Sequence, residues 1–119
     1  MHEESLVRTL IHQVEELAVK HEAAQVENIE LEIGPLSGVE RLLLESAFER
    51  LKSGSEFCED AALQIHHVEL TAKCQECEQQ FVIQNFRFVC SECHSSTVQI
   101  LTGDSMLLKN VQLRLTTGK

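Results

Sequence analysis

The chain has 119 residues, which suits one domain, or a small domain carrying a smaller module, and excludes large multidomain machinery. Hydrophobic residues make up 43% and charged residues 24%, as in globular rather than disordered or fibrous proteins. Ten Lys and Arg against nineteen Asp and Glu give a net charge of −9, and Trp and Tyr are absent. The negative charge and the scarcity of aromatic residues disfavour nucleic acid and anionic membranes as partners.

The ends and the cysteines indicate the compartment. No apolar run is long enough to span a membrane, and the start, Met1-His2-Glu3-Glu4, lacks the basic and then apolar character of a secretory signal. We therefore expect a cytoplasmic protein. In a reducing compartment, an odd count of five cysteines favours metal ligands plus one spare cysteine over a disulfide framework.

Hydrophobic periodicity predicts a helix over residues 5–21 and a half-buried strand over 26–33, ended by Gly34-Pro35. Ser37 and Glu40 then have the spacing of a capping box, which predicts a second helix over the run 42–51. Helical spacing places Glu40 on the face that points to the body of the protein. The expected buried face of this helix consists of Leu43, Leu44, Ala47, Phe48 and Leu51.

Two further strands are predicted, over 63–70 with a bulge around His66-His67, and over 111–115. Between them, residues 72–100 hold four of the five cysteines and are too few to fold without a metal or disulfides. We expect two domains, residues 1–71 completed by 101–119, and an inserted module, 72–100. The fold class is thus α+β: two helices packed on a small three-stranded mixed sheet, with an inserted four-cysteine zinc ribbon.

The module carries two CxxC pairs, Cys74/Cys77 and Cys90/Cys93, separated by twelve residues. Each pair directs two thiolates at one ion, so together they predict a closed, structural zinc site. We expect Phe81, Ile83 and either Phe86 or Phe88 to form an apolar patch beside it. The alternatives are four ordinary buried thiols, c-type haem on the CxxCH string that ends at His94, and iron in place of zinc.

A second metal site is suggested at the amino terminus. The Met1 amine, the His2 backbone amide and the His2 imidazole could chelate one ion, and such nitrogen ligands suit Ni(II) or Cu(II). A carboxylate or backbone nitrogen of Glu3 could supply the fourth ligand of a square-planar set. The alternative is that His2 is an ordinary exposed terminal residue.

The opening Met1-His2-Glu3-Glu4-Ser5-Leu6, the turn Ile33-Gly34-Pro35-Leu36-Ser37-Gly38-Val39-Glu40, and the four-cysteine module with His94 resemble the HypA/HybF family of hydrogenase maturation nickel chaperones. The resemblance covers essentially the whole chain, and the motifs occur in the order found in the family.

The resemblance implies a nickel metallochaperone rather than an enzyme. It would deliver Ni(II) to the large subunit of [NiFe]-hydrogenase together with the GTPase maturation protein HypB, and a homodimer is left open. His2 would be the principal nickel ligand and Glu3 a supporting one, while Cys74, Cys77, Cys90 and Cys93 would hold zinc. Glu40 matches a position where the family often has an acidic residue near nickel, although it could instead only close the capping box with Ser37.

The competing function is a zinc-ribbon protein-interaction adaptor without a transferable metal. An enzymatic role is not expected, because no nucleophile has a recognisable base. His12 and His21 are interpreted as structural, and the adjacent His66 and His67 face opposite sides of a strand. His94 is expected to lie near the zinc without binding it, and Cys58 is assigned no role.

Overall fold

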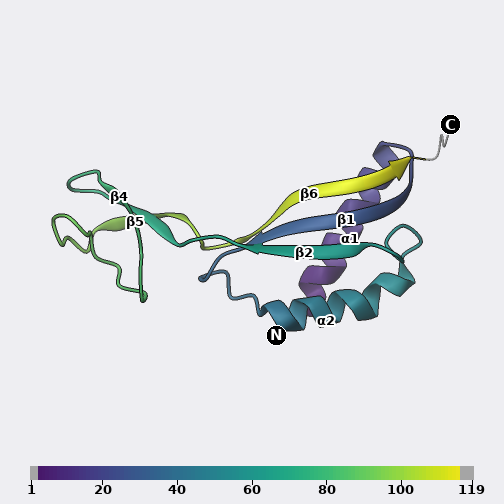
Figure 1. Cartoon of the computed structure of the whole chain (residues 1–119), viewed down its shortest axis with the longest axis horizontal. Helices are drawn as coiled ribbons and strands as arrows, with labels where there is room; N and C mark the ends of the chain where they lie inside the picture. Colours follow the sequence, from purple (N-terminus) through teal and green to yellow (C-terminus); the bar gives the residue numbers. More distant parts are fainter. Residues whose placement is uncertain (1–2, 116–119) are drawn as a thin grey trace. The chain divides into compact units, whose positions relative to one another are not determined.

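The computed structural model describes residues 3–115 (Figure 1). The elements are α1 (Glu3–Lys20), β1 (Ala23–Ile33), α2 (Arg41–Leu51), the 3-10 helix η1 (Lys52–Gly54), β2 (Ala62–His67), β3 (Thr71–Cys74), β4 (Gln80–Val82), β5 (Val98–Thr102) and β6 (Met106–Leu115). They form two compact units. The first contains residues up to 31, residues 39–65 and residues from 108 onward, and the second contains 32–38 and 66–107. Within the described part of the chain, no helix has the length and apolar character needed to cross a membrane.

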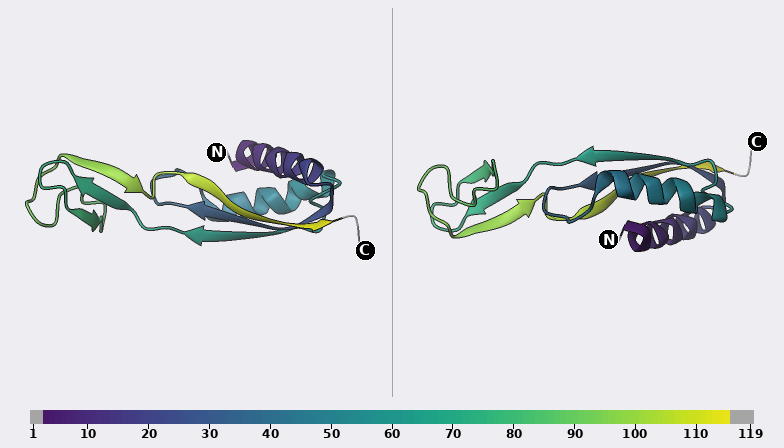
Figure 2. Two further views of the ribbon diagram at one scale, coloured as in Figure 1. Left: turned by 90° about the horizontal axis from the view of Figure 1, so that it is seen from above. Right: turned by 90° about the horizontal axis from the view of Figure 1, so that it is seen from below.

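A three-stranded sheet of order β2-β1-β6 forms the centre of the first unit. The arrows of β1 and β2 point the same way and that of β6 points the opposite way, so the sheet is mixed, and both helices pack on one of its faces (Figure 2). Parallel strands need a crossover connection. The segment that contains α2 supplies it between β1 and β2.

The core of this unit lies between the sheet and the helices. Alternate residues of β1, including Ile29, Leu31 and Ile33, are buried, and the intervening glutamates are more exposed. Asn110 and Arg114 of β6 contact Glu30 and Glu27 on the open face at 3.5 and 3.9 Å. The period-two pattern of the sequence therefore predicted both faces of β1 correctly. The buried residues of α1 also follow the predicted stripe: Val7, Leu10, Ile11, Val14 and Ala18.

The start of α2 differs from the prediction. Glu40 is its N-cap residue, and the Glu40 side chain makes no capping hydrogen bond in the described structure, so the expected capping box, with Ser37 as the N-cap, is wrong. Glu40 is also exposed rather than directed into the protein body. Leu43, expected in the core, is 53% exposed, because only one narrow side of this short helix is covered. The helix buries Leu44, Ala47 and Phe48.

The second unit contains a small antiparallel sheet of order β4-β3-β5. Its core consists of Leu70, Ala72 and Ile83, against which Phe81, Val98 and Ile100 pack. Phe81 and Ile83 thus lie in the expected apolar patch. Phe86 and Phe88 do not, since they are 59% and 36% exposed.

The strands on either side of the cysteine module have boundaries that differ from the predicted ones. The expected strand 63–70 is shorter in the structure, because β2 ends at His67 and the separate β3 begins only at Thr71. β6 begins five residues earlier than expected, at Met106. In the second unit, two backbone segments run in direct contact. The Gly34 N–H donates to the Ser105 carbonyl at 3.1 Å, and the Leu36 N–H donates to the Gly103 carbonyl at 2.8 Å. This approach requires Gly34 to lack a side chain, because a Cβ there would overlap the backbone of Gly103. Gly103 itself has φ of 100°, and a Cβ on it would instead crowd Leu70 and Glu69.

Candidate metal centres

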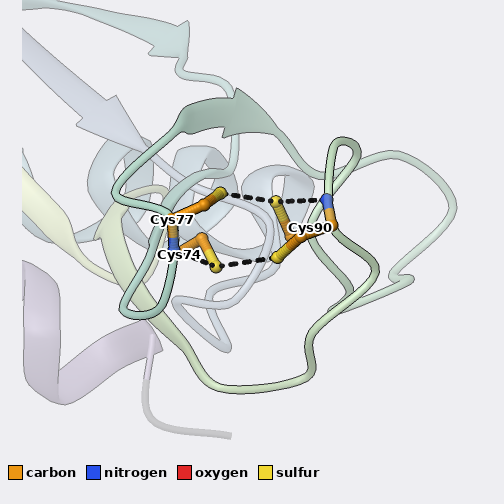
Figure 3. Close-up of side chains that lie close together, drawn as sticks. Cys74, Cys77 and Cys90 are labelled. Atoms are coloured by element: carbon orange, nitrogen blue, oxygen red, sulfur yellow. Dashed lines mark hydrogen bonds between the residues drawn. The ribbon is translucent and has the colours of Figure 1, made fainter.

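The four cysteines of the two CxxC pairs form one cluster in the second unit. Their sulfur atoms all lie within 4.8 Å of one another. The Sγ atoms of Cys74 and Cys93 are 3.6 Å apart, and those of Cys77 and Cys90 are 3.5 Å apart (Figure 3). All four are free thiols, so neither close pair is a disulfide.

The two pairs are built as matching turns. In the first, the N–H groups of Glu76 and Cys77 both donate to Cys74 Sγ at 3.4 Å. In the second, the N–H groups of Glu92 and Cys93 donate to Cys90 Sγ at 3.3 and 3.4 Å. The Cys77 N–H and then the Glu76 N–H stabilise the thiolate, which lowers the pKa of Cys74 to about 6. The pKa of Cys90 is lowered for the same reason, chiefly by the Cys93 N–H.

Each turn closes with a residue in the left-handed conformation. Glu78 and His94 follow the second cysteine of each pair, and both have φ of 65°. Their N–H groups donate to the carbonyls of Cys74 and Cys90 at 2.9 and 3.0 Å, which completes the two turns. The sequence analysis missed this role. It could have been predicted, because Glu78 and His94 each follow a CxxC pair directly in the sequence.

This donor set fits zinc. A tetrahedron with Zn–S distances of about 2.3 Å has edges of about 3.8 Å, close to the two short sulfur separations. Cys74 and Cys90 are buried and the other two are exposed. The cluster contains the four cysteines and, among the described residues, no further ligand such as His94. Four thiolates leave no open position, which is the arrangement of a structural rather than a catalytic site.

Of the residues predicted to bind nickel, Glu3 and Glu40 lie in the first unit. Met1 and His2 fall outside the described residues. Glu3 is only 6% exposed, and its Oε2 accepts a hydrogen bond from the Glu40 N–H at 2.9 Å. Two of the predicted ligand residues are therefore joined directly, although 37 positions separate them in the sequence.

This hydrogen bond also explains how α2 begins without a capping box. The Glu3 carboxylate supplies an acceptor at the start of the helix, where a negative charge is favoured by the helix dipole. Hydrogen bonds to this carboxylate, among them the one from the Glu40 N–H, lower the pKa of Glu3 to about 2. Sequence reasoning missed this contact, because it links residues that are distant in the chain.

The remaining candidates lie apart from both centres. His12 is exposed on α1 and contacts Glu16 at 3.3 Å. His21 lies in the turn after α1 and is exposed, so its expected place on the apolar stripe is wrong. His66 and His67 are both exposed on β2. Cys58 is fully buried, and burial raises the pKa of its thiol, which suits a packing role.

The chain is similar to proteins of known family along nearly its whole length. A family model described as "HypA: Hydrogenase/urease nickel incorporation, metallochaperone, hypA" matches residues 1–113. The hydrogenase maturation factor HypA of Shewanella oneidensis is 37% identical over 113 residues, which cover 95% of each chain. The HypA of Campylobacter jejuni is 34% identical over 114 residues, 96% of this chain and all of that one.

Solved structures agree. The solution structure of the Ni metallochaperone HypA from Helicobacter pylori is 34% identical, covers 97% of this chain and 99% of its own, and has a TM-score of 0.75. A second HypA solution structure is 35% identical, covers 95% and 96%, and has a TM-score of 0.77. The predicted resemblance and fold class are confirmed. The chain belongs to the HypA family of nickel-incorporation metallochaperones, a family that binds nickel and structural zinc and is not a family of enzymes.

Proposed function

We propose that this protein carries Ni(II) at its amino terminus and delivers it for insertion into the large subunit of [NiFe]-hydrogenase. His2 would be the principal ligand, through its imidazole and backbone amide, together with the Met1 amine, and Glu3 and Glu40 would contribute carboxylates. The relatives named hydrogenase maturation factors support a role in this pathway and hydrogenase-related partners. The partners would be a HypB-type GTPase and the large subunit itself, in the cytoplasm.

The observation that carries the proposal is the hydrogen bond between Glu3 and Glu40. It holds Glu3, the residue next to His2 in the sequence, against Glu40, the residue that precedes α2. Residues from both segments that carry carboxylates are therefore close together. Glu40 is exposed, which leaves it accessible both to the ion and to an approaching protein. A carrier needs such access, because it must release its cargo to a recipient.

In the same proposal, Cys74, Cys77, Cys90 and Cys93 hold a permanent zinc ion in an inserted domain of residues 72–100, with the nickel-binding domain formed by the rest. The short sulfur separations and the paired N–H donors support zinc at these residues. Zinc would supply cross-linking of two turns that are otherwise joined only by hydrogen bonds. The oligomeric state, with a homodimer as one possibility, is to be measured in the apo and nickel-loaded forms.

Nickel titration of protein with an unmodified terminus tests the proposal. A tag placed before Met1 and the substitution His2→Ala should each lower nickel affinity by at least about tenfold, as expected when a ligand is lost. Zinc content and the far-ultraviolet circular dichroism spectrum should not change. His12→Ala is the matched control, since His12 is an exposed histidine on the same helix as Glu3.

Variants of the two glutamates separate binding from capping. Glu3→Gln retains an oxygen that can accept the Glu40 N–H but removes the charge, whereas Glu3→Ala removes both. We expect Glu3→Gln and Glu40→Gln to weaken nickel binding while the helix content is preserved. If the tagged protein and His2→Ala bind nickel as tightly as the parent, the terminus is not the site. Transfer of bound nickel to the large subunit, with and without the GTPase, then distinguishes a carrier from an adaptor.

A further inference from the structure

A groove of about 350 Å³ lies within the second unit, away from the cysteine cluster. Its walls come from the segment between β2 and β3, from the end of β5, the loop that follows it and the start of β6, with Glu32 of β1 and Thr71 of β3 also lining it. The residues that give it its chemical character are Val68, Glu69, Leu101, Asp104 and Leu107.

The groove combines apolar walls with an acidic rim. Leu101 and Leu107 both line it and are 40% and 56% exposed, so two incompletely covered leucines border one hollow. Within residues 3–115, the carboxylates of Glu69 and Asp104 have no ion-pair partner. The groove thus presents exposed carboxylates without a cationic partner beside partly uncovered apolar surface.

The two threonine hydroxyls of the groove, on Thr71 and Thr102, are already bonded to protein atoms, which disfavours a small polar ligand or a metal ion as the occupant. Thr71 Oγ1 and Thr102 Oγ1 are hydrogen-bonded to each other at 2.6 Å, and Thr102 Oγ1 also donates to the Glu69 carbonyl at 2.8 Å. These groups satisfy one another and leave the leucines and carboxylates as the features that select a ligand.

We propose that this groove is a docking site for a partner protein, which inserts a segment that combines leucine-like side chains with Lys or Arg. An apolar side chain would fill the space between Leu101 and Leu107, and its cationic neighbours would pair with Glu69 and Asp104. A second copy of this chain is disfavoured as the occupant, because its net charge of −9 is repelled by the same carboxylates. The site does not require nickel, so it is tested independently of the proposed function.

A peptide of ten residues that alternates leucine and arginine is the probe, and a leucine–glutamate peptide of the same length is its control. Titration into the full-length, isotope-labelled, zinc-loaded protein should shift the amide resonances of 68–71 and 101–107 and leave those of α1 unchanged. Leu107→Ala should weaken the binding about fivefold, the factor expected from covering half of a leucine side chain. Asp104→Asn should weaken it about threefold.

Matched variants show whether the effect is specific. Leu115 lies on the same strand as Leu107 and is 53% exposed, and Asp60 is an exposed aspartate of the first unit. Leu115→Ala and Asp60→Asn should leave the affinity unchanged. If Leu107→Ala is not folded by circular dichroism, Leu101→Ala takes its place.

Three results would overturn the proposal. The first is equal weakening by the control variants, which would indicate general attraction of a cationic peptide to an acidic protein. The second is equal binding of the leucine–glutamate peptide. The third is a shift of the groove resonances with protein concentration alone, which would identify a second copy as the occupant.

Discussion

The contact between Gly34 and Gly103 predicts a large penalty for one added methyl group. A Cβ atom on Gly34 would overlap the carbonyl carbon, Cα and oxygen of Gly103, which are backbone atoms and cannot swing away. The segment around Gly103 would have to move, at a cost of about 1–3 kcal/mol for overpacking. The movement also breaks the two hydrogen bonds between these segments, each worth about 1 kcal/mol. Gly34→Ala should therefore lower the free energy of unfolding by about 3–5 kcal/mol.

Two other glycines serve as controls that separate overlap from backbone conformation. A Cβ on Gly54 meets no atom within 4 Å and the residue has no positive φ, so Gly54→Ala should be neutral or stabilising by up to about 1 kcal/mol. Gly38 also has open space but φ of 77°, so Gly38→Ala should cost about 1 kcal/mol.

Guanidinium titration of the zinc-loaded protein, followed by far-ultraviolet circular dichroism, measures the free energy of unfolding of all three variants. Without Trp or Tyr, intrinsic fluorescence is not suitable. The argument from rigid contact would be refuted if Gly34→Ala lowered the free energy of unfolding by less than about 1 kcal/mol, which is the loss expected for Gly38→Ala.

Three further predictions concern the cysteine cluster. Cys74→Ser should abolish stoichiometric zinc binding, measured as metal per chain by mass spectrometry, whereas Cys58→Ser should keep the zinc because Cys58 lies outside the cluster. The N–H groups of Cys77 and Glu76 lower the pKa of Cys74 to about 6, whereas at Cys77 the Gln79 N–H is outweighed by burial and the Cys90 thiol, which raise the pKa of Cys77 to about 12. Zinc affinity should fall steadily as the pH drops, because protons compete with the metal for all four thiolates. A chelating dye that reports zinc release between pH 8 and 5 tests this, and retention of zinc throughout would contradict it. His94→Gly should raise the free energy of unfolding by up to about 1 kcal/mol, because glycine adopts the left-handed backbone conformation of this position without strain. Denaturant titration measures the change. A loss of stability would show that the histidine side chain contributes more than the strain costs.

Local patterns account for the parts of the fold that were predicted correctly. The apolar stripe of α1 and the alternation of β1 follow from the geometry of a single element, and each needs only one buried face. The two CxxC pairs predicted the cysteine cluster for a similar reason, because two residues between thiolates already confine both sulfurs to one side of a turn.

The errors fall where a residue's surroundings come from elsewhere in the chain. Ser37 and Glu40 have the spacing of a capping box, but the acceptor for the Glu40 N–H is Glu3, held there by the packing of α1 beside α2. Leu43 fits a helical stripe, yet about half of its surface is exposed, and Phe86 is exposed in a turn with φ of 56°. Periodicity gives the direction of a side chain and not what lies opposite it.

The sequence by itself therefore determined the two helices, the strands of the first sheet in outline, the cysteine cluster and the family, since these depend on spacing along the chain. The strands β3, β4 and β5 of the second sheet were not predicted. The tertiary structure alone decided which carboxylate meets the start of α2, which glycines allow two backbones to touch, and which leucines remain uncovered beside an acidic rim. The physical reason is that burial and long-range hydrogen bonding depend on pairs of segments, and no local pattern records the identity of the partner segment.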